Sequence, residues 1–330
     1  MPPLPAPTPP EAAARILLAP MHGLADHVLR GVLTRQAPYA CCVSEFVRVT
    51  GSLLPVRTYE RLCPELLHDS RTAAGTPLRV QLLGSDPDWL AANAARLVTL
   101  RPAGVDLNFG CPAPTVNRHR GGAILLDEPE LLYRIVRAVR AVIPQAVPFS
   151  AKMRLGVNDA GRALEAADAL VQGGIDELVV HGRTKADGYR PPARWEAIAL
   201  IRAAVPVPVV ANGEIWNAAD YWRCRDISGC RDVMLGRGAV CDPLLPRRIQ
   251  GLSPEVPHWA ELQPAIADFW HQVQQRVLPA HAPGRLKQWL ALLARTCPEA
   301  RDFYQQLRRC NEIAAVDALL HVHSIFRPLA

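Results

Sequence analysis

One cysteine stands out because of the residues around it, Gly104 to Pro112, which read GVDLNFGCP. The apolar run from Gly104 to Leu107 predicts a short buried strand, and the Asn, Gly and Pro residues that follow predict a turn. Pro112 disfavours helical backbone at Cys111, so the turn that carries the thiol is stiff. A thiol at the end of a strand can act as a nucleophile or as a proton donor. The alternative is that Cys111 is one more small buried hydrophobic residue.

Polar residues also occur at six further apolar runs, at the end where a ligand would lie if the runs were parallel strands. Lys152 lies inside an apolar run, which is uncommon for a lysine that has no partner or function. Gln81 and His181 could instead be a satisfied core amide and a strand cap, and the glycines could serve tight turns. The candidates are His22, Gln81, Lys152 with Arg154, His181, Asn212 to Glu214, and Gly236 to Gly238.

The strands that would position these residues recur along the chain, with helical stretches between them. The strand candidates are Arg15–Ala19, Cys41–Phe46, Leu78–Leu83, Gly104–Asn108, Pro148–Met153, Glu177–His181, Pro208–Asn212 and Asp232–Gly236. The clearest helices are Trp89–Leu100, Glu130–Val142, Gly161–Val171 and Trp195–Val205. This alternation predicts an α/β fold, a parallel (β/α)8 TIM barrel, with a doubly wound open sheet as the alternative.

The composition divides the chain into three regions. Residues 1–11 are rich in proline and lack a core-forming pattern, so we expect a disordered tail. Residues 12–250 hold all the predicted strands, with an insertion of short helices from Arg48 to Thr76. Residues 251–330 predict a smaller, all-helical C-terminal domain of about four helices. These helices are expected at Ala260–Val277, Leu286–Ala294, Glu299–Cys310 and Glu312–Ile325.

Charge and cysteine content narrow the classes of function. The net charge is +6 and the pI is near 9.0, a mild basic excess that fits an anionic partner such as nucleic acid. The nine cysteines form no Cys-x-x-Cys motif, so no zinc or iron–sulfur site is expected. We find no signal peptide and no apolar run long enough for a membrane helix. These features predict a cytoplasmic protein with reduced thiols, and no obligate protein partner is evident.

The last two strand ends predict a phosphate site. Asn212-Gly213-Glu214 and Gly236-Arg237-Gly238 follow the seventh and eighth strands, where many barrels hold a phosphate with glycine N–H groups. The chain has no Gly-x-Gly-x-x-Gly after a strand, so a mononucleotide such as FMN is favoured over a tightly held dinucleotide. Lys152 is suited to stabilise the negative charge of a reduced flavin, and Gln81 could bind the amide edge of the ring. Backbone near Pro20 and Met21 could lie against the ring.

At this point the chain resembles a known family, the tRNA-dihydrouridine synthases, over about Leu17 to Asn311. The motifs that carry the resemblance are Ala19-Pro20-Met21, Val80 to Gly84, Asp106 to Pro112, Lys152 to Gly156, His181 to Thr184, Ala211 to Glu214 and Gly236 to Gly238. The sequence is most similar to the bacterial C-type members, which act on uridine 16 of the tRNA D-loop. The signs of that subtype are Ser44 to Arg48, Thr115 to Asn117, Gly188 to Arg190 and Arg285 to Trp289.

The resemblance implies a reaction and a role for each site residue. NADPH would reduce bound FMN, N5 of the reduced flavin would give hydride to C6 of a uracil, and Cys111 would protonate C5. The target base would have to leave its stack to reach the flavin. The implied FMN residues are Pro20, Met21, His22, Gln81, Lys152, His181, Asn212, Gly213, Glu214, Gly236 and Arg237. The implied uracil residues are Asn108, Arg154 and Tyr189, and the implied tRNA residues are Arg48, Arg285, Lys287 and Arg308.

Two features leave alternatives open. His22 stands where the family more often has an acidic or small residue after Pro-Met, and Arg285, Lys287 and Arg308 could be ordinary solvated helix charges.

A flavin oxidoreductase of small molecules on the same barrel is the first alternative function. It predicts turnover that is insensitive to salt, whereas tRNA binding should weaken as salt rises. A tRNA-binding folding helper whose catalysis is secondary is the second alternative.

Overall fold

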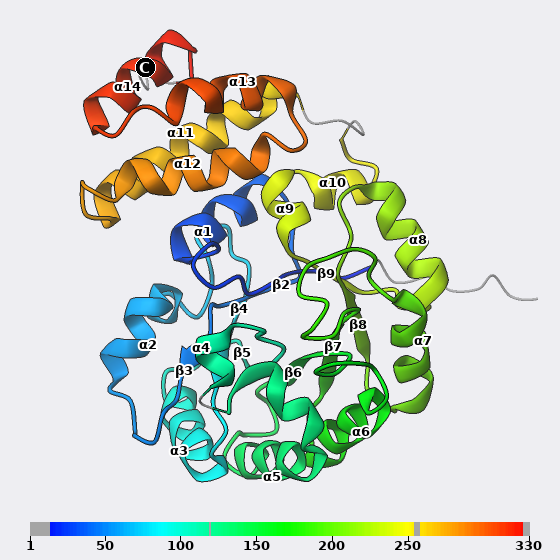
Figure 1. Cartoon of the computed structure of the whole chain (residues 1–330). Helices are drawn as coiled ribbons and strands as arrows, with labels where there is room; N and C mark the ends of the chain where they lie inside the picture. Colours follow the sequence, from blue (N-terminus) through cyan, green and yellow to red (C-terminus); the bar gives the residue numbers. More distant parts are fainter. Residues whose placement is uncertain (1–13, 119, 254–257, 326–330) are drawn as a thin grey trace, which may run out of the picture.

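The computed structural model describes residues 14–118, 120–253 and 258–325, and its centre is a closed barrel of eight parallel strands (Figure 1). The barrel strands are β1 (Ile16–Leu18), β2 (Cys41–Val43), β4 (Leu78–Leu83), β5 (Gly104–Phe109), β6 (Phe149–Arg154), β7 (Glu177–His181), β8 (Val209–Asn212) and β9 (Val233–Leu235). Because β1 pairs with both β2 and β9, and β2 pairs with β4, no edge stays open. The predicted TIM barrel is therefore confirmed, and the open doubly wound sheet is wrong.

The second predicted strand, Cys41–Phe46, is shorter than expected and is followed by a separate element. β2 ends at Val43, and Val47–Arg48 form a two-residue strand, β3, which pairs with the end of β4. The chain leaves the barrel at Ser44, whose hydroxyl donates to the Glu45 carbonyl at 2.8 Å and accepts the Gln81 N–H at 3.0 Å. The side chain of Phe46 consequently packs beside the barrel rim instead of inside it.

Six long helices cover the outside of the barrel and pack an apolar stripe against the strands (Figure 1). They are α1 (His27–Gln36), α3 (Pro87–Val98), α5 (Pro129–Arg140), α6 (Ala163–Gly173), α7 (Trp195–Ala204) and α8 (Ala218–Ser228). α5 shows why the sequence forms them, because Leu132, Ile135, Val136 and Val139 recur at helical spacing and are all buried. Shorter elements complete the barrel: α4 (Pro114–Asn117), η2 (Gly122–Asp127), α9 (Arg237–Cys241) and α10 (Leu245–Ile249).

The predicted insertion with short helices is confirmed. It contains β3, α2 (Val56–Leu62) and the 3-10 helix η1 (Pro64–Leu67). A buried ion pair attaches it to the barrel, since the guanidinium of Arg30 on α1 lies 3.0 Å from the Glu65 carboxylate. The Tyr59 hydroxyl also donates to the side-chain oxygen of Asn93 on α3 at 2.7 Å. These buried contacts hold the insertion against two barrel helices.

Four helices follow the barrel, in the order that the sequence predicts. They are α11 (Trp259–Arg276), α12 (Ala282–Leu293), α13 (Pro298–Leu307) and α14 (Ile313–Val322). α11 packs on α1 and α12 packs on α9, and the indole N–H of Trp289 donates to the Val240 carbonyl at 3.0 Å. Figure 1 shows this helical layer at the top of the view, beside the barrel and next to α1 and α9. The predicted tail, residues 1–11, lies outside the described residues, and no described helix is long and apolar enough to cross a membrane.

An ionic network closes the N-terminal end of the barrel. One carboxylate oxygen of Glu177 accepts from Arg79 at 2.5 Å, the other accepts from Arg15, and Arg15 also reaches Asp232 at 2.7 Å. The Glu177 side chain is only 7% exposed. These residues come from the starts of strands that are far apart in the sequence, so their charges join the two halves of the barrel.

We expect Glu177→Ala to lower the free energy of unfolding by about 3 kcal/mol, because it leaves two guanidinium groups without their shared carboxylate. Denaturant unfolding of the variant measures this loss. Glu165→Ala is the matched control, since Glu165 pairs with Arg162 on the surface and such pairs contribute roughly 0–1 kcal/mol. Equal stabilities of the two variants would show that the network contributes nothing.

Candidate functional site

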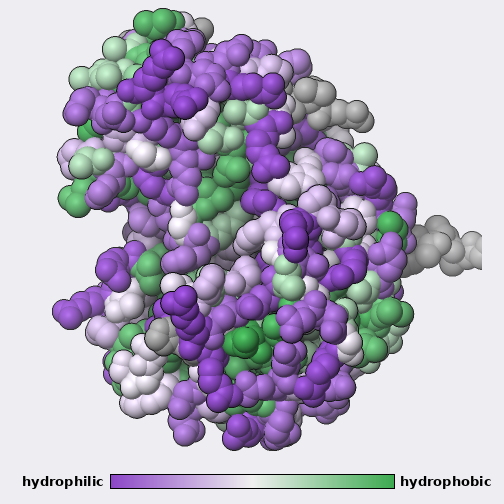
Figure 2. All heavy atoms as spheres, viewed as in Figure 1, coloured by the Kyte–Doolittle hydropathy of each residue, from purple (hydrophilic) through white to green (hydrophobic). Residues whose placement is uncertain are grey.

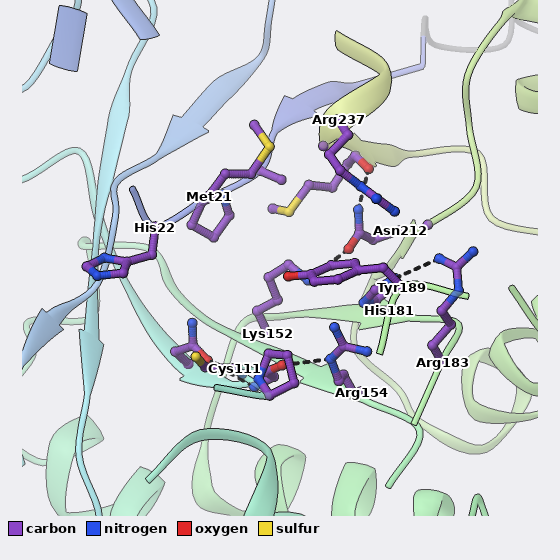
Figure 3. Close-up of a pocket in the computed structure, with 18 of the residues that line it drawn as sticks. Met21, His22, Cys111, Lys152, Arg154, His181, Arg183, Tyr189, Asn212 and Arg237 are labelled. Carbon is purple, nitrogen blue, oxygen red and sulfur yellow. Dashed lines mark hydrogen bonds between the residues drawn. The ribbon is translucent and has the colours of Figure 1, made fainter. Parts of the chain in front are cut away.

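A cavity of about 550 Å³ opens at the C-terminal ends of the strands (Figure 3). Polar groups brought there from most of the barrel strands line it, as the strand-end pattern predicts. All eleven residues predicted to contact the cofactor lie in its lining: Pro20, Met21, His22, Gln81, Lys152, His181, Asn212, Gly213, Glu214, Gly236 and Arg237. Cys111 and the three predicted uracil residues, Asn108, Arg154 and Tyr189, line it as well. Its volume is typical of a site for a small molecule or a cofactor.

Lys152 on β6 is the central cation of the cavity. Its ammonium group donates to the side-chain oxygen of Asn212 at 2.8 Å, and the Asn212 amide donates to the Met234 carbonyl at 2.7 Å. Burial and, to a smaller extent, the nearby charge of Arg154 lower the pKa of Lys152 to about 7. An anion in the cavity would reverse this shift, because it favours the charged form of the lysine.

Three arginines add positive charge around Lys152. Arg237 begins α9, Arg154 ends β6, and Arg183 follows β7. Sequence reasoning missed Arg183 as a site residue, although it belongs to the His181–Thr184 motif. It pairs with Glu214, its Nη1 lies 3.2 Å from Nε2 of His181, and burial lowers its pKa to about 10. Burial first, and these cations second, hold the pKa of His181 well below its usual range, so its ring is neutral at pH 7.

The glycines after β8 and β9 allow two loops to approach each other closely. Gly213 has φ of +111°, and a Cβ there would lie 2.7 Å from Cδ2 of His181. A Cβ at Gly238 would lie 2.1 Å from the backbone oxygen of Ile215. Larger residues at these positions would push the loops apart, because such distances are shorter than any van der Waals contact. The close packing keeps Asn212, Glu214 and Arg237 on one wall of the cavity.

Cys111 occupies the opposite wall, in the turn after β5. The Asn108 side-chain oxygen accepts the N–H groups of Gly110 at 3.0 Å and Cys111 at 2.8 Å, which fixes the turn. The cysteine is half-buried and lines the cavity, so it is not simply part of the hydrophobic core. Partial burial raises the pKa of the thiol, while Arg154 and Arg48 act in the opposite direction. The thiol is therefore protonated at pH 7, which suits a proton donor.

The family of this chain follows from comparison with known proteins. A sequence model described as dihydrouridine synthase (Dus) matches residues 17–320, nearly the full length of the chain. The chain belongs to the dihydrouridine synthase family. It is therefore an enzyme, and the resemblance seen in the motifs is confirmed.

Similar proteins cover almost the whole of this dihydrouridine synthase. A tRNA-dihydrouridine(16) synthase of Cupriavidus necator is 55% identical over 93% of this chain and 96% of that protein. A protein of the same name from Aquipseudomonas alcaligenes is 54% identical over 93% of this chain and 98% of that protein. Another from Neisseria meningitidis serogroup A is 46% identical over 95% of this chain and 96% of that protein.

Two solved structures share the fold at low sequence identity. Histamine dehydrogenase from Rhizobium sp. 4-9 has a TM-score of 0.54 and 14% identity, over 78% of this chain and 48% of that one. Morphinone reductase in complex with tetrahydroNAD has a TM-score of 0.50 and 14% identity, over 75% of this chain and 89% of that one. At this identity the likeness supports the barrel fold of the synthase and nothing more.

A buried carboxylate behind the cavity organises the wall that carries Cys111. Asp106 on β5 accepts from Nε2 of Gln81 and from the hydroxyl of Ser150, both at 2.6 Å. The other side-chain atom of Gln81, Oε1, accepts from the Asn108 amide at 2.7 Å. An ionised carboxylate can only accept hydrogen bonds, so Asp106 fixes which way the Gln81 amide points, and Gln81 then fixes the Asn108 amide. The Asn108 oxygen is thereby directed at the Cys111 turn. Sequence reasoning missed this role because Asp106 itself does not reach the cavity.

We expect Asp106→Leu to reduce turnover at least tenfold, because Gln81 and Asn108 lose the acceptor that orients them. Asp106→Asn should retain most of the activity, since its oxygen can accept from Gln81 while its amide donates to the Ser150 hydroxyl. Steady-state rates of both variants, with melting temperatures as a folding check, measure the difference. If the Asn variant is as slow as the Leu variant, the negative charge is what matters and the orienting role is wrong.

Tyr189 lies across the cavity between two cations (Figure 3). Its ring centroid is 5.2 Å from the Arg154 guanidinium carbon and 4.6 Å from that of Arg237, and the residue is 56% exposed. Arg154 is held in place by the carbonyls of Gly110, Thr184 and Gly188, at 2.8, 2.9 and 2.7 Å. The synthase thus presents an accessible aromatic ring beside a fixed guanidinium, which is a suitable arrangement for a planar base.

The four residues predicted to bind tRNA lie outside the cavity. Arg48 donates to the Thr115 carbonyl at 3.3 Å, and Arg285 on α12 pairs with Asp26 at 2.7 Å and so joins α12 to the loop before α1. Lys287 donates to Asn311 at 2.9 Å, and the exposed Arg308 donates to Gln305 at 3.2 Å. None of the four lines the cavity, although Arg285 contacts the carbonyl of Leu24, which does, and the charge of Arg48 acts on the Cys111 thiol. Within the described part of the synthase, no cluster of His, Cys, Asp and Glu suitable for a metal ion occurs.

Proposed function

We propose that this enzyme reduces the C5=C6 bond of uridine 16 in the D-loop of tRNA to 5,6-dihydrouridine, with FMN as cofactor and NADPH as the source of electrons. The observation that carries the proposal is the cavity itself, in which a protonated thiol faces a wall of cations across space for a small planar ligand. Relatives named tRNA-dihydrouridine(16) synthase, over almost equal lengths, support the position. Free tRNA lies in the cytoplasm, where we infer that the enzyme works.

The residues present fit FMN. Lys152, Arg154, Arg183 and Arg237 surround the cavity with positive charge, which suits a phosphate and an electron-rich ring. Ala19, Met21 and Met234 supply apolar surface for the ring, and Gln81 supplies an amide. We infer that Arg237 and the loop from Asn212 to Glu214 hold the phosphate, and that Lys152 and Gln81 contact the ring. When bound, FMN supplies the hydride that C6 of the uracil receives.

The side chains of the enzyme would supply the proton and hold the substrate. We infer that the Cys111 thiol carries the proton for C5, because its raised pKa keeps it protonated at neutral pH. Asn108, Arg154 and Tyr189 would hold the uracil by hydrogen bonds and stacking. A cavity of this size cannot admit a stacked strand, so the target nucleotide would have to turn out of the RNA to enter it.

The tRNA itself would lie on the surface around the cavity. Figure 2 shows a hydrophilic face with a hollow between helices α11 to α14 and the barrel, in which apolar residues gather. The net charge of +6 favours binding of an RNA backbone. We infer that Arg48, Lys287 and Arg308 contact the RNA, since phosphate contacts position a folded RNA. Because Arg285 is already paired with Asp26, we expect it to act mainly by holding α12 on the barrel.

Purified protein tests the proposal directly. We expect it to be yellow, with flavin absorption near ~450 nm, and to form dihydrouridine in tRNA transcripts when NADPH is supplied. Mapping of the product by primer extension should place it at position 16, and the reaction should slow as salt rises. A colourless protein that takes up no FMN, or turnover of free uridine that salt and tRNA do not affect, would contradict the proposal.

A further inference from the structure

A pair of stacked rings stands at the mouth of the cavity, apart from the arginine cluster. The imidazole of His22 lies on the ring of Phe46, with centroids 4.5 Å apart and an interplanar angle of 20°. Both residues line the cavity, yet the His22 side chain is 66% exposed while Phe46 is buried. Figure 3 shows His22 on the side of Cys111, away from Arg183 and Arg237. One face of the imidazole is therefore covered and the other is open to solvent.

The neighbouring residues hold this ring in place. Phe46 packs against Leu83 and Val116, with Cys111 and Ala113 beside them. The Glu45 carboxylate accepts the N–H of Gly23 at 2.6 Å, and the same oxygen lies 3.6 Å from Nδ1 of His22. A large exposed side chain is usually mobile, so ordering it before a ligand arrives lowers the entropic cost of binding. The arrangement is that of a preformed aromatic surface.

The surroundings of the ring favour RNA over a small ligand. Two residues after Phe46, the Arg48 guanidinium donates to one carbonyl and makes no ion pair within the described residues, so it can meet a phosphate. Arg285 lies on the other side, where it contacts the carbonyls of Gly23 and Leu24. Arg285 is neutralised by Asp26, so Arg48 is the cation here that is left for a phosphate. An exposed aromatic ring with a cation nearby is typical of surfaces that stack the bases of unpaired RNA.

We propose that the open face of His22 stacks on the base of a nucleotide adjacent to the target uridine. The inference rests on the proposed function, and it names a contact of that substrate. When one nucleotide turns into the cavity beside Cys111, its neighbours stay at the mouth, and they lose the stacking partner that has left. The His22–Phe46 pair lies at that mouth, next to Cys111, and replaces the lost partner with an aromatic face.

Replacement of the ring tests the contact. We expect His22→Ala to raise the Kd for tRNA about tenfold, because loss of an aromatic partner for one base costs roughly this much affinity. His22→Phe should bind within about threefold of the original protein, since it keeps the ring. The exposed His271 on α11 provides the control, and His271→Ala should bind tRNA normally. Phenylalanine would also keep a ring packed on Phe46, so the affinities show that the ring matters and the position of the contact is tested separately.

A fluorescent base locates the contact. In tRNA that carries 2-aminopurine on either side of the target uridine, one of the two positions should be quenched by the original protein and by His22→Phe, but not by His22→Ala. Equal affinities of the Ala and Phe variants, or quenching at neither position, would overturn the proposal. Binding and quenching are measured without turnover, so a failure here is distinct from a failure to form dihydrouridine.

Discussion

Cys111→Ala is expected to lower dihydrouridine formation about 10²–10⁴-fold, the range that loss of a general acid produces. The thiol lines the cavity, its backbone is held by the Asn108 side chain, and its raised pKa keeps it protonated at neutral pH. The variant should still contain FMN, because the cations expected to bind the cofactor lie on the other wall. Its flavin should also still be reduced by NADPH at a normal rate.

Single-turnover measurements separate these steps. The rate of flavin reduction is followed by the loss of absorbance on mixing with NADPH, and product formation is followed after tRNA is added. Cys310→Ala is the matched control, because Cys310 is a half-buried thiol beyond the end of α13 and outside the cavity. Undiminished product formation by Cys111→Ala would show that another group supplies the proton.

Lys152→Met is expected to slow NADPH-driven turnover about 10²–10³-fold, the range seen when one preorganised electrostatic contact is removed. Methionine has a similar length and suits a buried site, so the change removes the charge and leaves little empty space. The variant also removes the donor to Asn212, whose oxygen then lacks its 2.8 Å partner. Lys185→Met, outside the cavity, is the control. Turnover by Lys152→Met within threefold of the original rate would contradict the role.

The same lysine makes cofactor binding depend on pH. In the absence of an anion, burial holds the pKa of Lys152 at about 7, below its ordinary value of 10.5. Bound FMN should raise this pKa, so between pH 7 and 9 the protein takes up a proton when it binds FMN. The affinity for FMN should therefore fall as pH rises, by up to about tenfold per pH unit. Equilibrium titrations with FMN at pH 7, 8 and 9 measure this slope, and Lys152→Met should lack it.

The stability of the cofactor-free protein should change with pH in the opposite direction. The folded pKa of Lys152 is depressed, so between pH 7 and about 10.5 the unfolded chain binds more protons than the folded one. The unfavourable burial of the charged lysine is complete below pH 7 and disappears as pH rises through this range. Lys152 therefore contributes increasing stability above pH 7, and Lys152→Met should show a smaller rise.

Local sequence patterns predicted the barrel and the strand-end residues of its cavity, whereas Tyr189 was named only through the family resemblance. Strand and helix periods repeat within a few residues, and Lys152 stands out in an apolar strand without any knowledge of its partners. The predicted ends of the strands were less accurate where tertiary contacts compete with strand pairing. At Ser44 the hydroxyl interacts with Glu45 and Gln81, and the predicted strand Cys41–Phe46 ends early.

Residues that act behind or around the cavity could not be found in this way. Asp106 reads as one more residue of a buried strand. Its effect on Cys111 passes through the amide of Gln81, 25 residues away along the chain, and from there to the amide of Asn108, 27 residues from Gln81. Glu177 gains its importance only from Arg15 and Arg79, which lie 162 and 98 residues away. Such roles depend on which side chains meet, and the linear order does not contain that information.

The amino-acid sequence by itself therefore determined the parallel barrel, the polar rim of its C-terminal end and the thiol in the turn after the fourth predicted strand. Parallel strands that close into a barrel must bring their ends to one rim, so strand-end residues can be grouped before any coordinates are known. The tertiary structure alone decided the protonation preference of Lys152, the orientation of Gln81 and Asn108, and the stacking of His22 on Phe46. These properties arise from burial and from contacts between distant segments, which exist only once the chain has folded.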